Sequence, residues 1–430
     1  MRPFGGMDDC LKGQIRKFNI IFVIAAAIFY TAFQLSGIAS EVGTLYFRYA
    51  EAMVDMKMPY SGFDAEYPPF AMLLILIPRL FSFSSFTYQI AFGVEVYLFL
   101  LAGLICVHRM ASYYTDRPSV YSNLYIVLCI ILLDFILDRY DVLPMIMCVM
   151  ALYFVRTDRL NLAWVMIALG TVTKLYPALL APVLLIYLIS KRDYSSALKG
   201  IAICLAIGCA SMLPFLIADP ESMFMFLTYH MDRGMQTEAI VSSFLMLFGY
   251  FGMVDIGYAF SYGSDNITGS VPDTIAGGIL YITIIMILVT YAAYAYMINR
   301  REEKDMFPLF SMTCFLTVML FMLIGKVLSS QYLVWIIPFV VIAAVLLSEG
   351  AYGRSVRVFV GSIVLTQANM IVNYAFRDAG DPFSLPGILI LVVRNVLLLV
   401  LLWMIVRYLI VRHDPASYPE LSGCDKPVEE

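Results

Sequence analysis

The sequence predicts an all-α fold: a polytopic membrane helical bundle of about twelve transmembrane helices, with further peripheral or re-entrant helices at its outer face. Two observations on composition and one on pattern predict it. Of the 430 residues, 61% are apolar and only 14% are charged, whereas soluble domains carry about 45–50% apolar and about 25% charged residues. The apolar residues also gather into runs close to the roughly 20 residues that cross a bilayer. Lipid therefore forms part of the solvent of this chain.

Twelve apolar runs account for the predicted membrane crossings. The first is too long for the apolar core of a signal peptide, which spans about 7–15 residues, so it is expected to remain as a helix. Two more stretches, 68–83 and 240–254, are expected to lie on or dip into the outer face without crossing. The twelve runs are 18–38, 86–107, 121–137, 141–155, 160–175, 177–190, 200–217, 275–298, 307–324, 329–348, 356–374 and 386–411.

The basic residues predict the orientation of the bundle. With these twelve crossings, 19 of the 28 Lys and Arg residues lie on the side that carries both termini. By the positive-inside rule that side is cytoplasmic, which makes the chain a multi-pass cell-membrane protein with both termini inside. The long loops, about 39–67, 218–239 and 255–274, then lie on the extracytoplasmic face. We expect one transmembrane domain over 1–411 and a disordered cytoplasmic tail over 412–430.

Composition also excludes several functions. The formal charge is −4 and no basic tract exists, so the chain is not expected to bind nucleic acid. The eight cysteines form no C-x-x-C pair and the chain has only three histidines, a pattern that does not predict a disulfide framework or a metal site. We expect no cofactor and identify no metal-ligating residues, and the sequence neither requires nor excludes a metal.

The first outer loop is rich in carboxylates, and two of them adjoin apolar helices. Partial desolvation at such a junction raises a carboxyl pKa toward the range of a general base, which makes Glu41 and Glu66 candidates, with Asp64 between them. The Tyr67-Pro68-Pro69 run after Glu66 is expected to stiffen the chain and start a helix. A solvated loop is the alternative interpretation. The five carboxylates are Glu41, Glu51, Asp55, Asp64 and Glu66.

Four cations lie near the outer ends of predicted spans, where they can bind a phosphate beside lipid. They are Arg139, Lys174, Arg233 and Lys326. A structural ion pair with Asp138 or Asp141 is the alternative for Arg139. For Lys174, which has no adjacent acid in the sequence, the alternative is an ammonium that reaches the lipid headgroups.

Five short motifs between about residue 40 and 338 resemble the GT-C superfamily of integral-membrane glycosyltransferases, and within it glycosyltransferase family 87. They occur in the family's order. The motifs are Pro59-Tyr60 with Glu66-Tyr67-Pro68-Pro69, Arg139-Tyr140-Asp141-x-x-Pro144, Lys174-Leu175-Tyr176-Pro177, Tyr229-His230-x-x-Arg233-Gly234-x-Gln236-x-Glu238, and Lys326-x-x-Ser329-x-Gln331-Tyr332-x-x-Trp335.

The resemblance implies that one sugar, mannose or another aldose, moves from a polyprenyl-phosphate donor to a lipid or glycan acceptor on the extracytoplasmic side. GT-C enzymes place a catalytic acid, usually Asp, just after the first span. Glu41 is the nearest counterpart here, and Gly62 replaces a second acid, so the base stays open among Glu41, Asp64 and Glu66. Further motif residues are expected to contact substrate: Tyr67, Asp141, Tyr176, His230, Glu238, Gln331 and Trp335.

These residues predict an inverting transfer in which a carboxylate is the general base and the four cations stabilise the departing phosphate. The expected partners are the donor, the acceptor and membrane lipids, and the protein is expected to be a monomer. Two alternatives have other chemistry: a lipid or solute transporter or flippase, and a GT-C-type oligosaccharide ligase. A transporter would place its polar residues near the bilayer midplane, whereas most of them here lie near one face.

Overall fold

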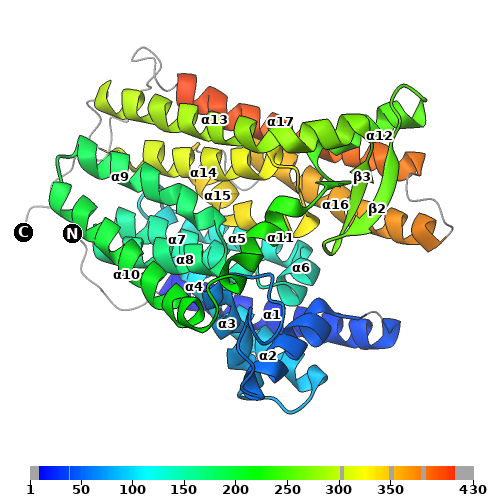
Figure 1. The fold of residues 1–430 in the computed structure, drawn as a ribbon. Helices are drawn as coiled ribbons and strands as arrows, with labels where there is room; N and C mark the ends of the chain where they lie inside the picture. Colours follow the sequence, from blue (N-terminus) through cyan, green and yellow to red (C-terminus); the bar gives the residue numbers. More distant parts are fainter. Residues whose placement is uncertain (1–8, 38, 301–304, 348–352, 379–383, 412–430) are drawn as a thin grey trace, which may run out of the picture.

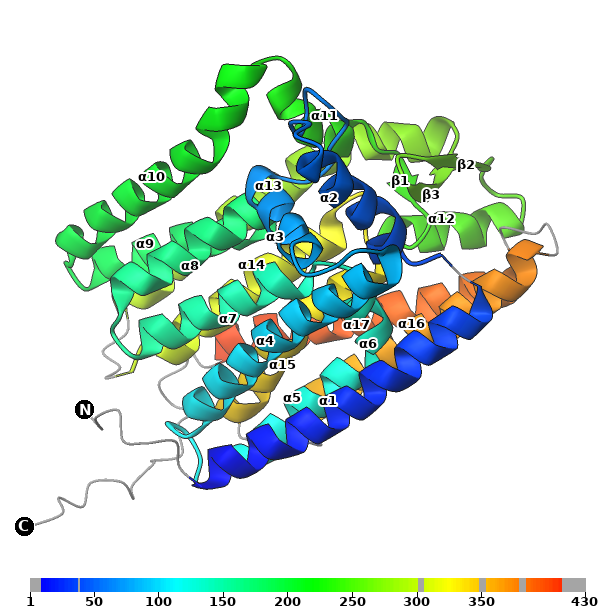
Figure 2. The same ribbon diagram turned by 90° about the horizontal axis from the view of Figure 1, so that it is seen from below.

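The computed structural model describes residues 9–37, 39–300, 305–347, 353–378 and 384–411. The chain folds into a bundle of roughly parallel and antiparallel helices, which confirms the predicted all-α membrane fold (Figure 1). The first described helix begins, and the last one ends, at the same end of the bundle (Figures 1 and 2). The predicted tail, 412–430, lies outside the described residues, and the single domain over 1–411 stays a prediction.

The N-terminal half of the chain contains α-helices, one π-helical turn (η1) and short 3₁₀ turns (η2, η3). These are α1 (Asp9–Ser36), η1 (Val42–Tyr46), α2 (Phe47–Val54), α3 (Pro69–Arg79), α4 (Ser85–Ala111), α5 (Pro118–Ile131), α6 (Leu133–Asp138), α7 (Val142–Arg156), α8 (Leu160–Thr173), η2 (Tyr176–Leu179), α9 (Leu180–Ser190), α10 (Tyr194–Ala218), η3 (Ser222–Phe224) and α11 (Met225–Asp232).

The C-terminal half adds a small sheet and four long helices. Its elements are β1 (Met235–Gln236), α12 (Ile240–Tyr250), β2 (Gly257–Ser261), β3 (Ser264–Thr268), α13 (Ser270–Arg300), α14 (Phe307–Ile324), η4 (Ser330–Tyr332), α15 (Leu333–Leu346), α16 (Arg354–Asp378) and α17 (Leu385–Val411).

Among the described residues, each predicted crossing corresponds to one helix or to two consecutive helical elements. Within the described residues, seven helices are long and apolar enough to cross a membrane: α1, α4, α10, α13, α14, α16 and α17. The other five predicted crossings correspond to shorter apolar helices, so their crossing stays a prediction. The stretches 68–83 and 240–254 form helices of 11 residues. At 1.5 Å per residue each is about 17 Å long, too short for a core of about 30 Å.

The predicted span 121–137 is not one continuous helix, because it breaks at Leu132 between α5 and α6. The side-chain amide of Gln367, on α16, donates to the carbonyl of Ile131 at 3.1 Å and to the carboxylate of Asp134 at 2.8 Å. A side chain from another helix therefore satisfies polar groups exposed by the break, as a lipid environment requires.

The stretch 255–274, which the sequence predicts to be a loop, forms most of a three-stranded antiparallel sheet in the order β1-β3-β2. Tyr262 and Gly263, between β2 and β3, both have positive φ, 51° and 65°. This is the conformation of a two-residue hairpin turn whose twist matches the flanking strands. The Tyr262-Gly263 pair is the local sequence feature that indicates this turn.

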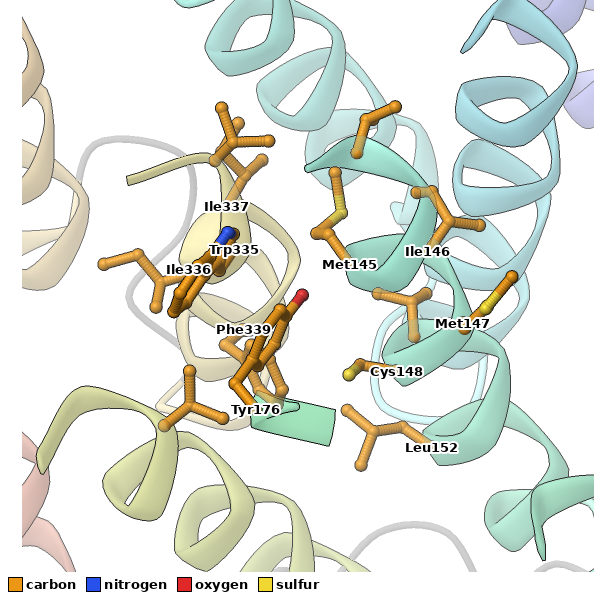
Figure 3. Close-up of a cluster of buried hydrophobic side chains, with 14 of the residues drawn as sticks. Met145, Ile146, Met147, Cys148, Leu152, Tyr176, Trp335, Ile336, Ile337 and Phe339 are labelled. Atoms are coloured by element: carbon orange, nitrogen blue, oxygen red, sulfur yellow. The ribbon is translucent and has the colours of Figure 1, made fainter. Parts of the chain in front are cut away.

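Helices α7 and α15 form the centre of the bundle. Almost all of their side chains are buried, together with Tyr176 of η2 (Figure 3). Helix α10, in contrast, buries only Ala197 and Gly200. A Cβ on Gly200 would lie 2.0 Å from the Trp164 ring, so glycine allows α10 to approach α8 closely. The other faces of α10 are apolar and exposed, as expected for a helix that contacts lipid.

Candidate active site

The first outer loop folds largely into η1 and α2, and it holds Glu41 beside a cation from another element. Oε2 of Glu41 lies 2.7 Å from Nη1 of Arg139, which follows α6. The Tyr67 hydroxyl donates to Oε1 of Glu41 at 3.0 Å. Two sequence-predicted site residues, 98 positions apart, are therefore in direct contact, and a third orients the carboxylate.

Local structure explains how Tyr67 and Arg139 are positioned. Pro68 is extended and Pro69 begins α3, as the sequence predicted, and the Tyr60 hydroxyl donates to the Tyr67 carbonyl at 2.6 Å. Asp138 accepts a hydrogen bond from the Ser40 hydroxyl at 2.6 Å and lies 3.2 Å from Nη1 of Arg139. Arg139 is thus shared between Glu41 and Asp138, and the structural ion pair with Asp138 is present as well.

Burial and charge act in opposite directions on Glu41, whose side chain is 27% exposed. Burial raises the pKa of Glu41 above its ordinary value, while the Arg139 guanidinium and the Tyr67 hydrogen bond lower it. The net result is a raised pKa. A carboxylate with a raised pKa is a stronger base than one in water.

The other two candidate bases have different surroundings. The carboxyl group of Glu66 forms a hydrogen bond with the phenol of Tyr229, on α11. Its charge also acts on Glu41, so the two carboxyl groups belong to one electrostatic cluster. Asp64 is exposed. Of the three candidate bases, Glu41 and Glu66 are therefore partly buried among other polar side chains, and Asp64 is the exposed one.

Lys174 has a partner that the local sequence does not show. Its Nζ lies 2.6 Å from Oδ1 of Asp141, 33 residues away. The indole Nε1 of Trp335 donates to the same oxygen at 2.5 Å. No acid adjoins Lys174 in the sequence, and the pair forms because the fold brings the end of α8 to the start of α7.

Aromatic rings surround the Lys174 ammonium. Its Nζ lies 5.0 Å from the centroid of Tyr140, 5.3 Å from that of Tyr332 and 5.1 Å from that of Trp335. Cation–π attraction and the Asp141 pair both stabilise a charge whose side chain is only 18% exposed. Sequence reasoning missed Tyr140 and Tyr332 as part of the site, although both lie inside the motifs that it used.

Tyr176, Trp335 and Asp141 were predicted to contact substrate, but the structure buries all three to 2% exposure or less. The Tyr176 ring stacks on Trp335 with centroids 4.1 Å apart, inside the core of the bundle (Figure 3). Side chains so enclosed have no free surface for a substrate. Asp141 and Trp335 lie beside Lys174, and Tyr176 stacks on Trp335.

Arg233 and Lys326 interact electrostatically with each other, and Arg233 also acts on Lys174. The Lys326 ammonium donates to the carbonyl of Met231 at 2.6 Å, which joins the loop after α14 to α11. Arg233 repels both Lys326 and Lys174 electrostatically, and Arg139 also acts on Lys174. Burial and the Arg233 charge lower the pKa of Lys326, and Asp232 opposes them. The four predicted cations thus form one connected cluster.

Mutual repulsion among these cations favours an anion between them, since a phosphate would relieve it. The Nε atom of Arg233 is buried and has no hydrogen-bond partner within the described residues. Such a donor is available for a ligand.

Glu238 makes a contact that the sequence did not predict. Its Oε2 lies 2.7 Å from Nη1 of Arg394, a residue of α17 that is 1% exposed, and it accepts a hydrogen bond from the Ser330 hydroxyl at 2.5 Å. This pairing assigns Glu238 a structural contact. Gln331 accepts from Ser329 at 2.6 Å. His230 lies in α11, and its side chain is outside what the structure describes.

Among the described residues, no group of three or more His, Cys, Asp or Glu side chains is arranged to hold a metal ion. That the site has no metal-ligating residues stays a prediction, and the sequence left the metal requirement open.

The site thus combines a carboxylate with a cation cluster in a helical bundle that has seven candidate membrane spans among the described residues. The fold is similar to the crystal structure of ArnT from Cupriavidus metallidurans in the apo state. The TM-score is 0.50 and the identity 14%, over 92% of this chain and 78% of that chain. No curated protein sequence matches the chain.

The family model of glycosyltransferase family 87 matches residues 66–324, more than half of the chain. The chain belongs to glycosyltransferase family 87, so it is a membrane glycosyltransferase of GT-C type, and the predicted resemblance is confirmed. The match includes Glu66, Arg139, Lys174 and Arg233. Glu41 precedes it and Lys326 follows it.

Proposed function

We propose that this enzyme transfers one sugar from a polyprenyl-phosphate donor to a hydroxyl of a lipid or glycan acceptor on the extracytoplasmic side, with inversion. The observation that carries the proposal is the direct contact of a partly buried carboxylate, Glu41, with the cation cluster through Arg139. A base beside a phosphate site suits a reaction whose leaving group is a lipid phosphate.

Glu41 is the proposed general base. Its partial burial strengthens it as a base, and its Oε1 is oriented by Tyr67. Glu66, held by Tyr229, would orient the acceptor and maintain the negative charge of the pocket. The exposed Asp64 is the third candidate and would act from solvent.

Arg139, Lys174, Arg233 and Lys326 would hold the donor phosphate. A phosphate monoester leaving group carries a charge of about −2 near pH 7, so several cations that lie together stabilise it better than one. Asp141 neutralises Lys174 at 2.6 Å. A phosphate would share this cation or displace the Lys174 head group toward itself.

The proposed reaction is a single displacement. The acceptor oxygen forms a bond to the anomeric carbon as the bond from that carbon to the phosphate oxygen breaks. The acceptor proton passes to the Glu41 carboxylate, and the electron pair of the broken bond leaves with the polyprenyl phosphate, where the four cations receive the negative charge.

Membership of a glycosyltransferase family favours this reaction over the transporter and flippase alternatives. An oligosaccharide ligase of GT-C type differs in its donor, a diphosphate-linked chain in place of one sugar phosphate. We favour the monophosphate and a mannosyl or other hexosyl group because the sequence motifs resemble those of family members that use such donors. The monomeric state and the cell-membrane location with cytoplasmic termini belong to the same proposal.

The test is a transfer assay with purified protein and polyprenyl-phosphate mannose. Glu41→Gln is expected to lower kcat by about 10²–10⁴, the contribution typical of a positioned base. Asp55→Asn, an exposed carboxylate of the same loop, is the matched control and should retain full activity. Full activity of Glu41→Gln, Asp64→Asn and Glu66→Gln, each measured alone, would eliminate the proposed carboxylate base.

A further inference from the structure

Tyr60, in the first outer loop, has a backbone conformation that residues with a Cβ rarely adopt. Its φ is 71°, in the left-handed region, where the side chain crowds the backbone. Within the described residues, four other non-glycine residues have a positive φ and all four are exposed, whereas Tyr60 is only 3% exposed. Such strain persists where surrounding contacts enforce it, and it is concentrated at functional sites. The contacts of Tyr60 therefore indicate its role.

Two helices outside the loop hold the Tyr60 ring. The ring meets that of Phe215, on α10, edge-on with centroids 5.2 Å apart, and its centroid lies 6.1 Å from that of Phe226, on α11. The backbone N–H of Tyr60 donates to the carbonyl of Phe63 at 3.0 Å, which closes a turn. The ring and the turn together keep the backbone in its strained conformation.

The Tyr60 hydroxyl is connected to the proposed base. It donates to the carbonyl of Tyr67 at 2.6 Å, so it joins the two ends of the segment 60–67. The Tyr67 hydroxyl in turn donates to Oε1 of Glu41 at 3.0 Å. Two hydrogen bonds and one residue therefore separate Tyr60 from the carboxylate.

We propose that Tyr60 is a positioning residue for the transfer reaction: its hydroxyl holds the Tyr67 backbone so that the Tyr67 phenol stays on Glu41. Without this bond, the strained backbone at Tyr60 can relax toward an ordinary φ, and Tyr67 moves with it. The inference rests on the proposed transferase function and adds to it a residue that acts through another side chain.

Tyr88 supplies a matched control. It is fully buried, and its hydroxyl donates to the carbonyl of Ile75 at 2.7 Å. Because Tyr88 lies inside α4, the helix keeps its backbone in place when that bond is lost. Tyr60→Phe and Tyr88→Phe both keep the ring, so both should fold, and each removes one buried bond from a phenol to a carbonyl.

Kinetics with polyprenyl-phosphate mannose test the proposal. Tyr60→Phe should lower kcat about fivefold, the factor that one hydrogen bond of ordinary strength contributes. Its KM for the donor should stay within about twofold, because the donor's contacts are unchanged. Tyr88→Phe should change neither constant.

The pH profile separates positioning from a purely structural role. The Tyr67 hydrogen bond lowers the pKa of Glu41, so its loosening in Tyr60→Phe raises that pKa. The acidic limb of the kcat/KM profile should then move to higher pH, while Tyr88→Phe leaves it in place. Both variants keep the other groups that act on Glu41, which are Arg139, Asp138, Glu66 and Tyr46.

A double variant tests whether Tyr60 acts through Tyr67. Tyr60→Phe combined with Tyr67→Phe should shift the acidic limb no further than Tyr67→Phe alone, because the phenol that Tyr60 positions no longer bonds Glu41. Residues that act as one unit depart from additivity in this way. Additive shifts, or a Tyr60→Phe profile that superimposes on that of Tyr88→Phe, would overturn the proposal.

Infrared titration tests the positioning without catalysis. The band of the protonated Glu41 carboxyl, identified by its absence in Glu41→Gln, should persist to higher pH in Tyr60→Phe than in the unsubstituted protein or Tyr88→Phe. An unshifted band in Tyr60→Phe would overturn the proposal. Absence of transfer by the unsubstituted protein, together with the shifted band, would refute the transferase function and leave the positioning of Glu41 by Tyr60 standing.

Discussion

At the scale of single residues, the chemistry of the candidate site depends on how each charge is surrounded. Glu41 is balanced between burial, which raises its pKa, and the contacts with Arg139 and Tyr67, which lower it. Lys174 is held by one carboxylate and three aromatic rings. Two predictions at this scale follow from these contacts.

Tyr67→Phe should move the pH dependence of transfer. The Tyr67 hydroxyl donates to Glu41 and lowers its pKa, so loss of this bond raises the pKa of Glu41. The base must be ionised, and activity therefore falls as pH drops through that pKa. The acidic limb of the kcat/KM profile should therefore shift to higher pH. Arg139→Gln should shift this limb in the same direction and further.

Tyr281→Phe, in an exposed part of α13, controls for the loss of a hydroxyl and should leave the profile unchanged. A Tyr67→Phe profile that superimposes on that of the unsubstituted enzyme would assign the acidic limb to another group.

Substitutions in the Lys174–Asp141 pair distinguish its contribution to stability from its contribution to activity. Asp141→Asn should lower the free energy of unfolding by about 3 kcal/mol, because it leaves a buried cation without its counter-charge. Lys174→Met combined with Asp141→Leu removes both charges and should recover most of that stability, yet kcat should remain about 10²–10³ below normal, because a phosphate ligand is missing.

Thermal unfolding and single-turnover transfer, measured on the same preparations, check the two parts. Lys199→Gln, an exposed lysine of α10, is the control. Recovery of activity in the double variant would show that Lys174 has only a structural role.

At the scale of elements, a buried charge in the last helix connects three segments near the site. Arg394 of α17 donates to the carboxylate of Glu238 at 2.7 Å and to its carbonyl at 2.5 Å, and Ser330 of η4 donates to the same carboxylate. The backbone N–H of Gln236 also donates to the backbone carbonyl of Lys326 at 3.0 Å. Helix α17 thus holds the segments that follow Arg233 and Lys326, through Glu238 and Ser330.

Arg394→Met should lower the unfolding temperature more than Arg407→Met, which removes an exposed arginine of the same helix. Removal of one partner of a buried pair costs about 3–5 kcal/mol, whereas an exposed charge contributes about 0–1 kcal/mol. Thermal unfolding of the protein in detergent measures the difference. Equal unfolding temperatures for the two variants would contradict the tethering role.

At the scale of the whole molecule, the loops that carry the candidate site gather at the end of the bundle opposite the start of α1 (Figure 2). The positive-inside rule predicts that this end is extracytoplasmic. The orientation of the bundle in the membrane determines on which side of the membrane the site binds its substrates.

Cysteine labelling checks this orientation. In a variant whose native cysteines are replaced by serine or alanine, Lys57→Cys should react with a membrane-impermeant maleimide in intact cells. Ser195→Cys, exposed in the turn that begins α10, should react only after permeabilisation. The reverse pattern would place the site on the cytoplasmic side and would exclude a donor presented outside.

Features that depend on local sequence were predicted, whereas features that depend on contacts between distant segments were not. Helices, the start of α3 at Pro69 and the cluster of Glu41 with Arg139 follow from runs and motifs in the sequence. The hairpin was missed because the turn residues Tyr262-Gly263 were its only local signal. The break at Leu132 was missed because Gln367, which stabilises it, belongs to another helix. The partner of Lys174 was missed for the same reason: Asp141 is 33 positions away.

The sequence by itself determined that the protein is a helical membrane bundle of glycosyltransferase family 87 type, because hydropathy and short motifs are local properties of the chain. The tertiary structure alone decided which carboxylate meets a cation, which aromatic rings enclose Lys174, and that Tyr176 and Trp335 are buried and not open to substrate. These outcomes depend on distances and desolvation between segments far apart in the sequence, and only the packed bundle determines both.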